Sequence, residues 1–290
     1  MPHFDTFVAI DWSGAARSYD GIAVATCGCG QSAPKLIAPP SGTRWTRRQV
    51  AEWLKSRIDG VQRLLIGFDF GFGLPFEPVD GYLGGNAPGI DDIFSLWSLL
   101  EAKSCAEADF GCTRFIADPM YASLFWTAGP KPRSWVERKR ETEHACSKST
   151  KTRPDTLYKL LHSKQVGKAS LTGMRVLHHV RSSTGNCVAI WPFERVRHSA
   201  FVEIYPTMFR KMATGSVAKI RSQSNLNIAL SQLGSQRTSN NAKRDLSDHE
   251  TDALLSAAGL RWIASHATVW APTGLSSPRV QREGWIFGVY

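Results

Sequence analysis

The stretch FVAIDWSG, residues 7–14, decides the fold that we expect for this chain. Four apolar residues in a row predict a buried strand, and the Ser-Gly pair after Trp12 predicts the turn that ends it. A second run, RLLIGFD at residues 63–69, is also apolar and also ends on an aspartate. Because both runs read as buried strands, we expect an α/β core in which these two strands are central neighbours.

The rest of the chain supplies the other layers of this core. Strands are expected at 21–26, 35–38, 187–191 and 201–205, and helices at 47–58, 90–102 and 171–181. Residues 222–244 are polar and predict a loop or a marginal helix. Ser247 followed by Glu250 predicts a capping box at the start of a last helix.

Composition limits the class of protein. The chain has 290 residues, of which 42% are hydrophobic and 21% charged, which excludes wholesale disorder. No apolar run is long enough to span a membrane, and residues 1–5 lack a signal-peptide pattern, so we expect a cytoplasmic protein. The six cysteines are expected to be reduced, because they show neither a disulfide framework nor zinc-site spacing.

The net charge of +10 points to partners rather than to a fold. A polyanionic partner such as nucleic acid and a merely basic protein account equally well for the total. The charge is local, however: residues 131–181 hold 13 Lys or Arg and four acids. We expect residues 77–184 to form a basic, helical insertion that contacts nucleic acid, the alternative being a solvated basic face. Its candidate contacts are Arg133, Arg138, Lys139, Arg140, Lys148, Lys151, Arg153, Lys164 and Lys168, with Trp135 for base stacking.

Carboxylates are the residues with the clearest chemical potential. Asp11 and Asp69 are expected side by side at the carboxyl ends of parallel strands, where α/β sheets bind ligands. Asp248 and Asp252 are one helical turn apart and share a face of the last helix. Several buried carboxylates need a cation, and Mg²⁺ or Mn²⁺ prefers such oxygen ligands. Three acids of the chain also fit simpler roles: Asp11 as a turn residue, Asp248 as a helix-dipole residue, and Glu203 as a solvent-facing strand residue.

Five segments resemble one known family: FVAIDWSGA, LLIGFDFGFGLP, FVEIYP, DHETDAL and EGWIFG are similar to the domain-of-unknown-function family 429. That family is described as predicted nucleases with an RNase H-like fold. The resemblance implies one RNase H-like domain over 1–290, with a mixed sheet flanked by helices and the insertion at 77–184. It implies one or two Mg²⁺ or Mn²⁺ ions held by Asp11, Asp69 and Asp252, with Asp248 or His249 as a further ligand. The catalytic residues that it implies are Asp11, Asp69, Asp248, Asp252 and, from a later strand, Glu203.

The sequence therefore predicts a metal-dependent nuclease, in which a metal-activated water attacks a phosphorus atom. One alternative is a phosphotransferase of the actin and sugar-kinase superfamily, in which the Asp-x-Ser-Gly turn at Ser13 would hold ATP phosphates. In a nuclease the same Ser13 is a candidate contact to the nucleic-acid backbone. The other alternative is a non-catalytic nucleic-acid-binding module that keeps the fold and uses its basic face.

Overall fold

The computed structural model describes residues 1–15, 21–58, 61–161, 166–239 and 245–290, and a six-stranded mixed sheet lies at its centre. In the order β3-β2-β1-β4-β8-β7, the strands are Lys35–Ile37, Ala23–Gly28, Thr6–Asp11, Leu64–Phe68, Ser199–Glu203 and Val188–Ile190. The pairs β1–β2 and β2–β3 are antiparallel, whereas β1–β4, β4–β8 and β7–β8 are parallel. This arrangement confirms the predicted RNase H-like α/β fold class and the predicted pairing of the first and fourth strands.

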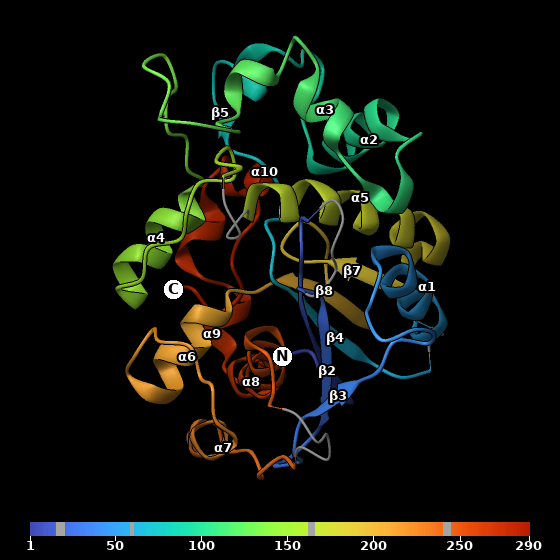
Figure 1. The fold of residues 1–290 in the computed structure, drawn as a ribbon, viewed down its shortest axis with the longest axis vertical. Helices are drawn as coiled ribbons and strands as arrows, with labels where there is room; N and C mark the ends of the chain where they lie inside the picture. The colour runs from blue at the N-terminus through green and yellow to red at the C-terminus, as the bar shows by residue number, and fades with distance from the viewer. Residues whose placement is uncertain (16–20, 59–60, 162–165, 240–244) are drawn as a thin grey trace.

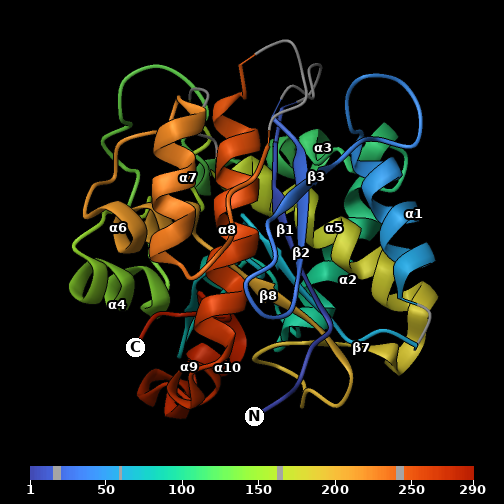
Figure 2. The same cartoon turned by 90° about the horizontal axis from the view of Figure 1, so that it is seen from below.

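Helices cover both faces of the sheet (Figures 1 and 2). One face carries α1, α2 and α5, and the other carries α6, α7 and α8. The described helices are α1 Arg47–Arg57, α2 Ile93–Ser104, α3 Thr113–Ala117, α4 Glu141–Thr150, α5 Val166–Thr184, α6 Pro206–Thr214, α7 Gln223–Gln232, α8 Asp248–Ala264, α9 Ala267–Trp270 and α10 Val280–Glu283. A short hairpin, β5 Phe76–Glu77 with β6 Gly81–Tyr82, lies outside the main sheet.

Alternation along β1 explains why both faces need a cover. Val8 and Ile10 belong to the core shared with α1 and α5, whereas Phe7 and Ala9 belong to the core shared with α8. Side chains of successive strand residues point to opposite faces, so an unbroken apolar strand buries both. The apolar run that predicted a strand therefore also accounts for its central place.

The segment 77–184 contains α2 to α5, as its helical pattern predicted. Its helix α5 is mostly buried and packs against α1 and α2. The polar stretch 222–244 contains α7, and residues 240–244 lie outside the described part. The capping box of α8 is confirmed: Ser247 accepts a hydrogen bond from the Glu250 N–H, and Glu250 accepts one from the Ser247 N–H.

Two other sequence expectations concern the cysteines and the possibility of a membrane-spanning helix. All six cysteines are free. Among the described helices, none combines the length and the apolar character that a membrane crossing requires.

Candidate active site at the carboxyl ends of β1 and β4

Two aspartates meet where the neighbouring parallel strands end. Asp11 is the last residue of β1, and Asp69 directly follows β4. The pairing of Ile10 with Phe68 continues in a hydrogen bond from the Asp69 N–H to the Ile10 carbonyl at 3.0 Å. The two carboxylates are therefore held at one edge of the sheet by backbone register, as their positions in the sequence predicted.

Helix α8 brings two more side chains to this edge. Nδ1 of His249 donates to Oδ1 of Asp11 at 2.7 Å. Asp252, three residues later, lies on the same side of the helix and is buried. Of the two residues that the resemblance offered as a further ligand, His249 is the one that contacts Asp11. The half-exposed carboxylate of Asp248 pairs instead with Arg221 at 3.7 Å.

Two basic side chains reach Asp252 from the other side. Arg210 of α6 donates to Oδ1, and Lys219 of the α6–α7 connection donates to Oδ2. We call Asp11, Asp69, Asp252, His249, Arg210 and Lys219 the open cluster. Arg210 and Lys219 were not among the sequence-predicted residues, because they lie 42 and 33 positions from Asp252.

The surroundings of the Asp11 and Asp69 carboxylates in the open cluster disfavour their ionised form. Burial raises the pKa of Asp11, and the hydrogen bond from His249 opposes that rise. The pKa of Asp69 is raised well above its usual range by burial and then by the charges of Asp11 and Asp252. The bond to Asp11 raises the pKa of His249. A site that pushes carboxylates toward protonation gains free energy from a bound cation.

Pairing of the individual oxygens shows where such a cation would bind. Among the described residues, Oδ2 of Asp11 and both carboxylate oxygens of Asp69 accept no hydrogen bond and join no ion pair. Both oxygens of Asp252 are occupied by Arg210 and Lys219. No group of three His, Cys, Asp or Glu in the described ranges is placed to hold a metal ion. The residues do fit a Mg²⁺ or Mn²⁺ ion bound by two carboxylates and completed by water or substrate oxygens, a common arrangement for Mg²⁺.

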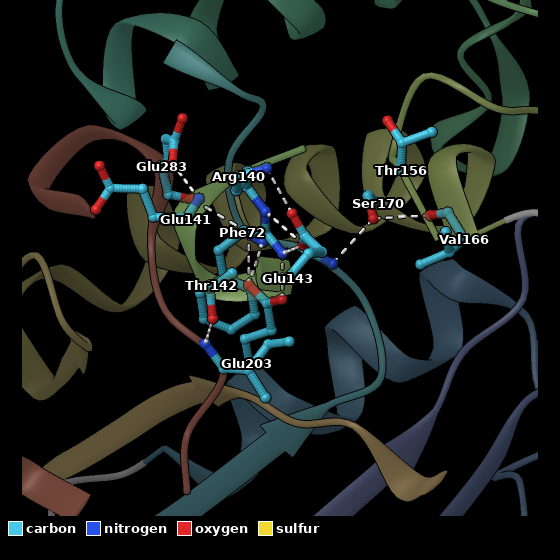
Figure 3. Close-up of polar contacts among 12 residues, drawn as sticks. Phe72, Arg140, Glu141, Thr142, Glu143, Thr156, Val166, Ser170, Glu203 and Glu283 are labelled. Atoms are coloured by element: carbon cyan, nitrogen blue, oxygen red, sulfur yellow. Dashed lines mark hydrogen bonds and ion pairs between the residues drawn. The ribbon is translucent and has the colours of Figure 1, made fainter. Parts of the chain in front are cut away.

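Glu203 lies outside the open cluster. It ends β8 and is buried, and it forms an ion pair with the equally buried Arg140 through both of its oxygens, at 2.5 and 2.8 Å. The Phe72 N–H also donates to Glu203 at 3.1 Å (Figure 3). Because its oxygens are bound by an arginine and a backbone amide, Glu203 is a structural residue here. The alternative of a solvent-facing side chain is wrong, and the catalytic role of Glu203 stays a prediction.

Arg140 also contacts two further glutamates, the carboxylate of Glu143 and the backbone carbonyl of Glu283, the latter at 3.1 Å. Its guanidinium and its N–H donate to Glu143, at 2.5 to 2.9 Å. Glu283 accepts from the N–H groups of Phe76 and Glu141, both at 2.8 Å, and from Arg279 at 3.0 Å. We call Arg140, Glu143, Glu203, Glu283 and Arg279 the closed cluster, because all six carboxylate oxygens are paired.

The closed cluster corrects part of the predicted nucleic-acid surface. Arg140 is 1% exposed, so it is not available to a phosphate. Trp135 is also buried, and its indole N–H donates to the Leu124 carbonyl, so it is not a stacking platform. Arg138 and Lys139 lie in the lining of a cavity of about 520 Å³ that also holds Arg279 and an equal number of acids, so the lining has no net positive charge; the acids are Glu77, Asp80 and Glu137.

The other predicted contacts are placed differently. Arg133, Lys148, Lys151 and Arg153 are exposed, and Lys164 lies outside the described residues. Lys168 is half-buried in the first turn of α5. A Cβ atom on Gly14 would overlap the backbone of Lys168 and Ala169, so only glycine lets the turn after β1 approach α5 this closely.

Ser13 lies at the rim of the open cluster. A Cβ atom on Gly21 would be 3.2 Å from Oγ of Ser13 and 3.3 Å from Cε1 of His249, so these two side chains are close neighbours. The Ser13 carbonyl accepts a hydrogen bond from the buried Arg47 at 3.1 Å. The structure thus brings Ser13 to the sheet edge where the sequence predicted a phosphate contact.

Comparison of the chain with protein-family models, curated proteins and solved structures found no match.

Proposed function

We propose that this chain is a divalent-metal-dependent nuclease that hydrolyses phosphodiester bonds of DNA or RNA. One observation carries the proposal: Asp11 and Asp69 are fixed side by side with three carboxylate oxygens left unpaired among the described residues. Asp69 is only partly buried, so its oxygens can be reached by a ligand from solvent, and a cation there would offset the charge of two neighbouring carboxylates. Mg²⁺ or Mn²⁺ bound there would supply an activated water and charge stabilisation at phosphorus.

The chain's own residues have separate tasks in this proposal. Asp11 and Asp69 hold the cation at the sheet edge. His249 fixes the orientation of the Asp11 carboxylate through its 2.7 Å hydrogen bond and leaves Oδ2 free. Ser13, which lies beside His249, donates a hydrogen bond to a substrate phosphate in this proposal.

A basic surface next to the cluster supports a polyanionic substrate. Helices α4 and α6 lie side by side (Figures 1 and 2), and Nζ of Lys211 donates to the Lys151 carbonyl at 3.1 Å. This surface leads to Asp252 through Lys219. We call it the basic rim; its residues are Lys148, Lys151, Arg153, Lys211, Lys219 and Arg221, of which Lys211 is partly exposed and the others exposed. Such a row of cations binds a phosphate backbone independently of base sequence.

The test begins with metal binding, because it does not require the right substrate. We expect saturable binding of Mn²⁺ by calorimetry in the wild-type chain, and its loss in Asp11→Asn and Asp69→Asn. Asp248→Asn is the matched control: it removes a half-exposed acid of α8 that pairs with Arg221, so metal binding should be unchanged.

Cleavage is then measured on single-stranded, duplex and branched DNA and RNA with Mg²⁺ or Mn²⁺. Wild type and Asp248→Asn should cleave at least one of these substrates, and the Asp11 and Asp69 variants none. Nucleic-acid binding without metal affinity or cleavage would instead assign a non-catalytic binding module. Stabilisation by ATP in place of cleavage would assign a phosphotransferase.

A further inference from the structure

The two cations on Asp252 differ in how firmly the fold holds them. Arg210 is 4% exposed and also donates to Oγ1 of Thr207 at 2.7 Å and to the Val217 carbonyl at 3.3 Å. The Lys219 side chain is 36% exposed, and its ammonium group bonds to Oδ2 of Asp252. Arg210 and Asp252 therefore form a fixed buried pair, to which Lys219 is added from the solvent side.

We propose that Lys219 is a phosphate-contact residue that exchanges partners when the substrate binds. Without substrate its ammonium group occupies Oδ2 of Asp252. A phosphodiester next to Asp11 and Asp69 draws Lys219 to its own oxygens, and the freed Oδ2 of Asp252 becomes available to the metal ion. This inference rests on the proposed nuclease function and adds that substrate and metal bind cooperatively.

The charge balance of the open cluster favours this exchange. The formal charges of its three carboxylates, Arg210 and Lys219 sum to −1, with His249 left out of the count. A divalent cation alone would bring the site to +1, and a phosphodiester alone would bring it to −2. Both together bring it to zero, so each ligand lowers the electrostatic cost of binding the other.

The chemistry of the two side chains assigns the exchange to Lys219 rather than to Arg210. A lysine ammonium is a compact charge on a flexible stem, and it can turn from one oxygen to another without loss of packing. Arg210 would leave Thr207 and Val217 unpaired if it moved. Arg210 therefore keeps Asp252 in place while Lys219 changes partner.

The exchange also explains the incomplete metal site. Asp252 is the third carboxylate of the cluster, yet no three-ligand group is formed among the described residues. In this structure Lys219 occupies the oxygen that would complete it. The substrate-free chain is therefore a two-ligand site, and substrate makes the third ligand available.

Calorimetry of Lys219→Met tests the proposal. The probes are Mn²⁺ alone and Mn²⁺ with a phosphorothioate oligonucleotide that resists cleavage. In the wild type we expect the oligonucleotide to tighten Mn²⁺ binding about fivefold, which is the lower range of typical coupling between sites. In Lys219→Met, Mn²⁺ alone should bind about threefold more tightly, because an exposed competing ion pair has been removed. The oligonucleotide should then tighten Mn²⁺ binding by clearly less than in the wild type, because only the direct attraction between metal and phosphate remains, and should itself bind about tenfold more weakly.

Two control variants separate this role from a general effect of charge. Lys211→Met removes another cation of the basic rim and should keep the fivefold coupling. Lys219→Arg keeps the charge and should also keep most of the coupling, which assigns the loss in Lys219→Met to the missing charge. The Mn²⁺ binding that Lys219→Met retains shows that this variant is folded. Equal coupling in wild type and Lys219→Met overturns the exchange while leaving the nuclease function intact. A wild type that binds no Mn²⁺, with or without oligonucleotide, overturns both.

Discussion

The open and closed clusters each place three carboxylates near one edge of the sheet, but they pair their oxygens in opposite ways. In the closed cluster, the guanidinium of Arg140 lies between Glu143 and Glu203, and backbone N–H groups bind the remaining oxygens (Figure 3). In the open cluster, the carboxylate of Asp69 has no hydrogen-bond partner among the described residues. A carboxylate at a strand end is thus structural when the fold supplies its donors and available for a ligand when it does not.

The difference in carboxylate pairing gives the two clusters different roles, because the closed cluster stabilises the fold and the open cluster is available to a ligand. A fully paired buried cluster holds elements together: Glu203 of β8, Glu143 of α4 and Glu283 of α10 all meet around two arginines. An incompletely paired cluster weakens the fold in the absence of a ligand, and such strain is typical of functional sites. Substitutions in the two clusters should therefore change stability in opposite directions.

The largest effect is expected for Arg140→Met in the closed cluster. The substitution leaves Glu143 and Glu203 buried without their cation, and we expect the free energy of unfolding to fall by about 3–5 kcal/mol. Urea unfolding at pH 7 measures the change. Arg138→Met, two residues away and partly exposed, is the matched control and should change stability by less than about 0.5 kcal/mol. Equal stability of the two variants would mean that the closed cluster does not hold the fold.

The opposite sign is expected for Asp69→Asn in the open cluster. Burial and the charges of Asp11 and Asp252 raise the pKa of Asp69, so its ionised form is unfavourable in the folded chain. The neutral amide should raise the free energy of unfolding by about 1 kcal/mol in metal-free buffer while abolishing metal binding. Urea unfolding with EDTA checks the sign, and a loss of stability would place Asp69 among the structural acids.

The pH dependence of stability sharpens the same contrast. The folded chain holds the proton of Asp69 more tightly than the unfolded chain, whose value is near 3.8. The stability that this proton provides is fully present below pH 3.8 and is lost as pH rises through the raised folded pKa. His249 acts in the same direction, because its folded pKa is raised above 6.5.

Unfolding with EDTA between pH 4 and pH 8 measures this loss as the difference between wild type and Asp69→Asn. The wild type should lose stability relative to the variant by at most about 1.4 kcal/mol per pH unit, the limit for one proton. Burial also raises the pKa of Glu143 and Glu283, but these groups are common to both chains and cancel. A constant difference across this range would show that Asp69 is ionised in both states.

Local pattern explains which parts of this contrast were predictable. The adjacency of Asp11 and Asp69 follows from two apolar runs that each end on an acid, because parallel register places strand ends together. Glu203 shows the same local pattern, but its carboxylate is paired by Arg140, which is 63 positions away in the sequence. The segment around Arg140 has the composition of an exposed, basic surface, so the sequence does not predict this pairing. Arg210 and Lys219 are likewise distant from Asp252. Only the tertiary fold decides which acid receives its own cation.

The smallest expected effect concerns the members of the basic rim that lie outside both clusters. Lys148 and Lys151 are exposed residues of the α4 segment, a few positions after the buried Arg140. The double variant Lys148→Ala and Lys151→Ala should leave the free energy of unfolding within about 0.5 kcal/mol of wild type, because neither side chain compensates a buried acid. It should lower the slope of log affinity for single-stranded nucleic acid against log salt by about 0.7 for each phosphate contact removed.

The control is the double variant Lys55→Ala and Arg57→Ala, at the end of α1 on the opposite face of the sheet, which should leave the slope unchanged. An identical slope in all three proteins would exclude Lys148 and Lys151 from the phosphate contacts and leave Lys219 as the cation that meets the substrate.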